Sequence, residues 1–266
     1  MKITARRVLA AALSCAATAL LIVAIGFPSA HARRANYSLA ALLSTPVTPP
    51  SPTVDPIVAS ALADVPTGPA MISQLSSEGI SVSVDGAQIP IWRISGEAIG
   101  YTDQAIVDAG GNAVADGLDE SAAVGEVVSS NIGLKEAVAY ETLMQLLYDQ
   151  AAAKGTIVTI PDATSYAQNL YNQYFHDYEN PSPYTTPLKS PPTQSEFLST
   201  SAVQTYQFDL TVDQQKAGIV GSGSGNGTPA LATWLSNQLA DNSVSVTAVQ
   251  GITSANDLGS LLPSNL

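Results

Sequence analysis

This sequence is poor in the residues on which much catalytic chemistry depends. Its 266 residues include one cysteine and two histidines. Cys15 and His31 lie within the first 32 residues, so His176 is the only histidine beyond them and no cysteine follows. The chain after residue 32 can therefore form no disulfide, no thiol nucleophile and no metal cluster of histidines or cysteines.

Basic residues are also scarce. The chain has 10 Lys and Arg against 22 Asp and Glu, which gives a formal net charge of −12. Binding of nucleic acid or anionic lipid through charge needs a basic patch. The composition argues against a nucleic-acid partner, and it suits either a solvated acidic surface or a basic or unfolded polypeptide partner.

The first 32 residues have the pattern of an export signal. Basic residues precede an apolar run at Val8–Phe27, and small residues follow at Ala30 and Ala32. An uncleaved membrane anchor is the alternative, because about 20 apolar residues can span a bilayer. We expect an extracytoplasmic protein, secreted or associated with the cell envelope, whose only membrane contact would be an uncleaved N-terminal segment.

The composition then divides the rest of the chain. Residues 33–70 are rich in Pro, Ser and Thr toward their end, which predicts an extended, solvated linker. Residues 71–250 are long enough to bury one core, so we expect a single folded domain there. Residues 251–266 are predicted to form a flexible tail.

The stretch 134–174 predicts two consecutive helices. The first ends at Gly155, which suits the left-handed residue after a helix, and an extended piece at 156–160 follows. Thr159 is the expected cap of the second helix, with Pro161 in its first turn. The apolar residues of the first helix recur at helical spacing: Ala137, Tyr140, Met144, Leu147, Tyr148 and Ala151.

The remaining segments predict a mainly α fold with a small antiparallel pairing of its first and last strands. Residues 81–84 and 244–249 alternate apolar and polar side chains, and Asp85-Gly86 is a turn signal. Two isolated strands are expected to pair because a lone strand leaves its backbone groups unsatisfied. Other expected elements are helices at 95–107, 120–130 and 196–220, a short helix that begins at 228, and glycine-rich loops at 109–117 and 221–227. Asp119 is the expected cap of the helix at 120–130, in which Val124, Val127 and Val128 are expected to face inward.

Three segments, in this order, resemble parts of a known domain. They are Val84–Pro90, with its Val-Asp-Gly-x-x-Ile pattern, then Leu143–Ile160, with Ala-x-x-x-Gly at a helix end, and Ala232–Val249, with Trp-Leu and alternating valines. The set resembles the N-terminal chaperone domain of SurA-type and PrsA-type extracytoplasmic foldases. The resemblance implies paired first and last strands and a helical cradle for unfolded segments.

The chain departs from that family in several places. Asp85 stands where the family pattern has Asn, and residues 94–130 do not match closely. Many members carry a parvulin prolyl-isomerase domain, and the interval between Tyr178 and Thr228 is too short to hold one. The resemblance therefore implies a domain that acts as a chaperone alone, without prolyl-isomerase activity.

The residues that could carry chemistry have simpler interpretations. His176 beside Asp177 could act as a general base, but an exposed histidine at a helix end explains it as well. Asp116, Asp119 and Glu120 lack the spacing of a calcium-binding EF-hand loop. We therefore predict no enzyme activity, no catalytic residue, no cofactor and no metal site.

The second central helix is unusually aromatic. Its wide apolar arc predicts either a buried core or a surface for a partner, and the sequence leaves both open. The candidate peptide-binding residues are Tyr166, Tyr171, Tyr174, Phe175 and Tyr178. The predicted function is binding of unfolded or extended polypeptide without catalysis, and the alternative is a structural protein of the cell envelope on a proline-rich stalk.

Overall fold

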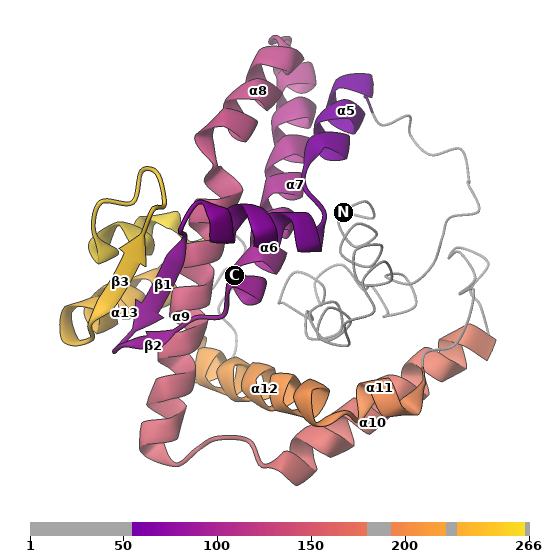
Figure 1. The fold of residues 1–266 in the computed structure, drawn as a ribbon, viewed down its shortest axis with the longest axis vertical. Coiled ribbons are helices and arrows are strands. Elements are labelled where there is room, and N and C mark those ends of the chain that lie inside the picture. Colours follow the sequence, from indigo (N-terminus) through magenta and orange to yellow (C-terminus); the bar gives the residue numbers. More distant parts are fainter. Residues whose placement is uncertain (1–54, 180–192, 222–227, 264–266) are drawn as a thin grey trace.

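The computed structural model describes residues 55–179, 193–221 and 228–263 (Figure 1). The predicted signal segment 1–32 lies outside the described residues, as does the predicted linker up to residue 54. Within the described ranges, no helix is long and apolar enough to cross a membrane. The elements are α5 (Pro56–Asp64), α6 (Gly68–Ser77), β1 (Ser81–Val84), β2 (Ala87–Gln88), α7 (Ile91–Asp116), α8 (Glu120–Ser130), α9 (Ile132–Lys154), α10 (Ile160–Glu179), α11 (Gln194–Phe197), α12 (Thr200–Val220), α13 (Thr228–Asp241), β3 (Val244–Thr247) and a 3-10 helix, η1 (Ala255–Leu261).

The molecule consists of a body and a limb. The body is formed by α5 to α9, α13, η1 and the sheet, and one hydrophobic core joins them. The limb is formed by α10, α11 and α12 up to Tyr206, which share a second, smaller core. In Figure 1 the limb runs across the lower end of α9, away from α5 and α8. The predicted mainly helical fold is confirmed.

Helix α9 is the centre of the body. Every side chain from Ala137 to Met144 is buried, because α7, α12, β1 and η1 all pack against this helix. It ends as predicted at Gly155, whose φ of 66° is the left-handed conformation that glycine adopts without a steric penalty. Five of the six predicted apolar positions are buried, and Tyr148 is half-buried.

The small sheet confirms the predicted pairing of the first and last strands. The strand order is β2-β1-β3, and both pairings are antiparallel. Asp85 and Gly86, with φ of 49° and 82°, form the turn into β2. Asp85 also joins the ends of β1 and β3, since its backbone N–H donates to the Ser243 carbonyl and its side chain accepts from the Ser243 N–H, both at 2.7 Å.

The predicted linker ends earlier than expected, because residues 56–64 form α5 and residue 68 begins α6. Asp55 caps α5 by accepting a hydrogen bond from the Ile57 N–H at 2.9 Å, and Pro56 occupies its first turn. Proline is compatible with that position because the first turn of a helix lacks a backbone acceptor for its N–H. Val58 and Leu62 are buried, so this segment belongs to the folded domain.

The prediction of a glycine-rich loop at 109–117 is also wrong, since α7 continues to Asp116. Gly110 is needed there by close packing: a Cβ at this residue would lie 2.3 Å from Val58 Cγ2 on α5. The α8 helix follows, capped as predicted by Asp119, whose side chain accepts from the Ala122 N–H. Val128 on α8 was expected to face inward and is 49% exposed.

Three smaller predictions need correction. Residues 251–266 were expected to be a flexible tail, but η1 packs against α9 and α13 with Leu258 fully buried. Residues 156–159 connect two helices as expected, but Ile160, which was assigned to the same extended piece, is the first residue of α10. The helix predicted at 196–220 is divided into α11 and α12, because Ser199 caps a new helix by accepting from the Ala202 N–H.

Candidate functional site

The limb contains the aromatic helix that the sequence singles out. Thr159 caps α10 as predicted, and its hydroxyl donates to the Asp162 carboxylate at 2.6 Å while accepting from the Asp162 N–H. The connection before α10 is fixed to α12, since Gln207 donates to the Val158 carbonyl and Thr211 accepts from the Val158 N–H. Helix α10 is therefore held to α12 at its beginning.

Tyr174 belongs to the core of the limb. It is 1% exposed and lies beside Phe197, which is fully buried, at 5.9 Å between ring centroids. A ring in this position cannot contact a partner while the limb stays folded, so Tyr174 is removed from the candidate peptide-binding residues. The buried residues of the limb core are Ala163, Ala167, Tyr174, Phe197, Ala202, Val203 and Tyr206.

The other four candidates are half-buried. Tyr166 lies against the core residue Tyr206 at 5.7 Å in an edge-to-face arrangement. Tyr171, Phe175 and Tyr178 form a continuous row along α10, with centroid separations of 6.0 Å and 6.4 Å between neighbours. We call these three residues the aromatic strip. Tyr171 and Tyr178 also pack against the limb core, whereas Phe175 is not among the described residues of that core.

The described side chains of the limb show no arrangement suited to nucleophilic or metal chemistry. His176 is exposed in the last turn of α10. Burial raises the pKa of Tyr174 and of Tyr206 above the ordinary tyrosine value, so both phenols stay protonated at neutral pH. Among the residues that the structure describes, no group of three or more His, Cys, Asp or Glu side chains could hold a metal ion.

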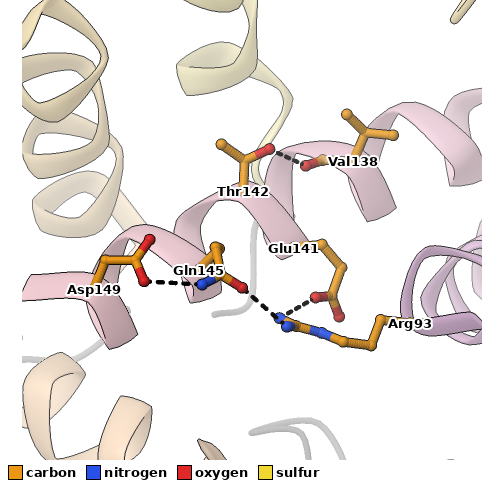
Figure 2. Close-up of polar contacts among 6 residues, drawn as sticks. All are labelled: Arg93, Val138, Glu141, Thr142, Gln145 and Asp149. Carbon is orange, nitrogen blue, oxygen red and sulfur yellow. Dashed lines mark hydrogen bonds and ion pairs between the residues drawn. The ribbon is translucent and has the colours of Figure 1, made fainter. Parts of the chain in front are cut away.

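A second unusual site, which the sequence reasoning missed, lies where α7, α9 and α12 meet. Arg93 on α7 pairs with Glu141 on α9 at 2.5 Å, and the two side chains are 12% and 5% exposed (Figure 2). Arg93 also donates to the Gln145 side chain at 3.2 Å, and Gln145 donates in turn to Asp149 at 3.0 Å. A charge pair this deeply buried must recover a large desolvation cost through its contacts.

Helix α12 completes the surroundings of Arg93. The guanidinium group lies 4.0 Å from the centre of the Phe208 ring, a distance typical of a cation–π contact. Phe208 stacks in turn on Tyr148 of α9 with 4.8 Å between centroids. Arg93 therefore links all three helices, and Phe208 is where α12 passes from the limb to the body.

Glu97 is another buried acid of this site. It is 6% exposed, and burial raises its pKa well above the ordinary glutamate value; the charges of Glu141 and Asp209 raise it further, while those of Arg93 and Lys216 lower it. Burial also raises the pKa of Glu141, although Arg93 opposes the shift. A sequence signal existed, because Glu97 and Glu141 occupy positions within otherwise apolar helical stripes.

Comparison with known proteins finds no matching family model, no matching curated protein and no matching solved structure.

Proposed function

We propose that this protein is an exported, non-catalytic, chaperone-like protein that binds unfolded or extended polypeptide. The resemblance to SurA-type and PrsA-type domains is one support. The pairing of β1 with β3 agrees with what that resemblance implies. The observation that carries the proposal is the aromatic strip, a row of three half-buried rings on a limb with its own small core.

The chemistry of the strip suits a varied polypeptide. Tyrosine rings offer a flat apolar face and one hydroxyl group, so they contact many different side chains without requiring a particular one. The limb is acidic as well: Asp162, Glu179 and Glu196 belong to α10 and α11. We therefore expect the favoured clients to be extended segments in which apolar residues alternate with Lys or Arg.

Aggregation of a reduced or heat-unfolded client protein provides the test. The full chain should suppress its light scattering in proportion to the amount added, and no nucleotide should be needed. Phe175→Ser should weaken binding of an unfolded client by about 1–2 kcal/mol, the cost typical of an aromatic residue in an interface. Gln173→Ser, an exposed position of the same helix outside the strip, is the matched control and should leave binding unchanged.

The alternative, a structural protein of the cell envelope, predicts a different result. A structural protein should not suppress aggregation at any ratio of protein to client. Equal binding by the Phe175→Ser and Gln173→Ser variants would retain a chaperone function but exclude the strip as its site. An assay of prolyl isomerisation in a short peptide should show no acceleration, and an acceleration abolished by a point substitution would contradict the non-catalytic assignment.

A further inference from the structure

Helices α7, α9 and α12 bring five charged side chains together where they meet. Two groups come from α7, Arg93 and Glu97, and Glu141 comes from α9. Helix α12 contributes Asp209 and Lys216. These five residues, which we call the charge cluster, contain three carboxylates and two cations, so one added proton makes the cluster neutral.

The charge cluster lies where the limb joins the body. Helix α12 is one continuous helix: its first part packs in the limb core through Ala202, Val203 and Tyr206, and its later part packs in the body core through Val212. Asp209 and Lys216 are on this later part. The connection between α9 and α10 is bonded to α12, so α10 and α11 must move with α12 if it separates from α9.

Every element around Glu97 contributes a group that responds to its charge. Tyr101 on α7 and Tyr140 on α9 lie edge to face at 6.0 Å, and burial, followed by the charge of Glu97, raises the pKa of both phenols. Lys216 on α12 lies 5.8 Å from the centre of the Tyr140 ring. The remaining charged neighbours are Arg93, Glu141 and Asp209. An ionised Glu97 therefore faces two other carboxylates in a largely buried interface, where charge repulsion is strong.

We propose that the charge cluster is a protonation-controlled latch: protonated Glu97 holds α12 docked on α7 and α9, and its ionisation releases the limb from the body. A neutral cluster has balanced charges and lets the apolar contacts of Phe208 and Val212 determine the position of α12. An excess buried negative charge is relieved when α12 separates and water reaches the carboxylates. The limb would respond in this way whatever it binds.

Energy transfer between two dyes measures the position of the limb directly. The full chain with Cys15→Ser carries two further substitutions, Ser73→Cys on α6 and Gln173→Cys on α10, and one dye is attached to each new cysteine. Both positions are exposed. As the pH is raised from about 5, the transfer efficiency should fall reversibly when Glu97 ionises, at a pH above the ordinary glutamate range. Glu97→Gln should keep the high transfer efficiency over the whole range, because the charge cluster can no longer gain that charge.

Glu136→Gln is the matched control. Burial, followed by the charge of Asp108, raises the pKa of Glu136 to about 7. Glu136 is therefore another glutamate with a raised pKa, but it lies on α9 and outside the charge cluster. The limb of this variant should leave the body at the same pH as the limb of the wild type. A pH response that is lost in Glu136→Gln, or that persists in Glu97→Gln, overturns the proposal, as does a wild-type limb that stays in place throughout.

Lys216→Met keeps the proposal testable if the Glu97→Gln variant does not fold. Loss of this cation leaves the charge cluster more negative, so the limb should open at a lower pH than in the wild type. Opening at the unchanged wild-type pH would contradict the latch.

Discussion

The body and the limb solve the problem of burying apolar surface in different ways. Among the described residues, the body core contains thirty-one that are buried, mostly Leu, Ile, Val and Ala, from nearly every element of the fold. The limb core contains seven, of which three are aromatic and three are alanine. The body is therefore specified by close aliphatic packing over many elements, whereas the limb depends on a few rings packed edge to face or at a tilt between two main helices.

This difference suggests that the two regions differ in local stability and in function. A core of seven residues supplies little hydrophobic stabilisation, so the limb should open locally at a lower free energy than the body. Segments that bind partners or move are commonly those of low local stability. The following substitutions and pH change test this difference between the body and the limb, beginning with the largest expected effect.

Gly133→Ala should damage the body most. A Cβ at Gly133 would lie 2.1 Å from Thr102 Oγ1 and 2.5 Å from the Thr102 backbone nitrogen, so α9 would have to move away from α7. We expect a loss of about 3 kcal/mol in the free energy of unfolding, the upper part of the range for overpacked cores. Urea denaturation followed by circular dichroism measures this loss.

Gly125→Ala is the control for that substitution. Gly125 lies on the exposed side of α8, and an added Cβ would meet no atom within 4 Å. The exchange should raise the free energy of unfolding by about 0.5–1 kcal/mol, because alanine favours the helix. Equal effects of the two substitutions would show that the contact between α7 and α9 is looser than described.

Tyr174→Ser should affect the limb alone. The substitution removes a ring that is 1% exposed from a core with few other members, and large-to-small changes of buried aromatic residues cost about 3 kcal/mol or more. Hydrogen exchange should show faster exchange for α10 and α11 while α7 and α9 keep their protection. Uniform loss of protection in both regions would mean that body and limb unfold together.

Raising the pH should destabilise the body. The pKa values of Glu97 and Glu141 are raised in the folded state, so the folded protein retains protons that the unfolded chain releases. The corresponding stability is fully present below the ordinary glutamate value of 4.5 and is lost as the pH rises through the raised values. In this pH range the free energy of unfolding should fall by roughly 1 kcal/mol per pH unit for each such group.

Urea denaturation at a series of pH values measures this slope, and Glu97→Gln should reduce it. The direction is opposite to ordinary acid denaturation, in which paired surface carboxylates lose stability as the pH falls. A domain that becomes steadily more stable from about pH 5 to about pH 9 would contradict the assigned environment of Glu97.

Asp85→Ala should have the smallest effect of the destabilising changes. It removes the acceptor for the Ser243 N–H at the junction of β1 and β3, and it places a less suitable residue at a φ of 49°. We expect a loss of about 1 kcal/mol, the net value of one hydrogen bond. Asp85→Asn keeps both an acceptor oxygen and tolerance of this conformation, so thermal melting should show it close to the wild type.

Local sequence signals predicted those elements whose ends are marked by their own residues. The caps at Asp119 and Thr159, the stop at Gly155 and the alternation in β1 and β3 were all recognisable, because each depends on a few neighbouring residues. The continuity of α7 was missed because the reason for Gly110 lies on α5, fifty-two residues earlier at Val58. Such contacts between distant segments leave no local pattern.

The candidate site was predicted in part for the same reason. The aromatic character of α10 is visible in the sequence, but only the position of Phe197 on α11 decides that Tyr174 is buried. The charge cluster was missed because its members come from three helices and no short motif connects them. Charged residues within apolar helical stripes, such as Glu97 and Glu141, are the signal that could have indicated it.

Hydrogen exchange of the full chain, with and without an excess of a permanently unfolded client protein, tests most directly whether the limb is the binding region. The account predicts additional protection in α10, strongest at residues 171–178, and unchanged exchange in α7 and α9. It also predicts that Phe175→Ser removes this protection while Gln173→Ser retains it. Protection confined to the body, or no change in any helix at a saturating client concentration, would contradict the assignment of the limb as the polypeptide-binding region.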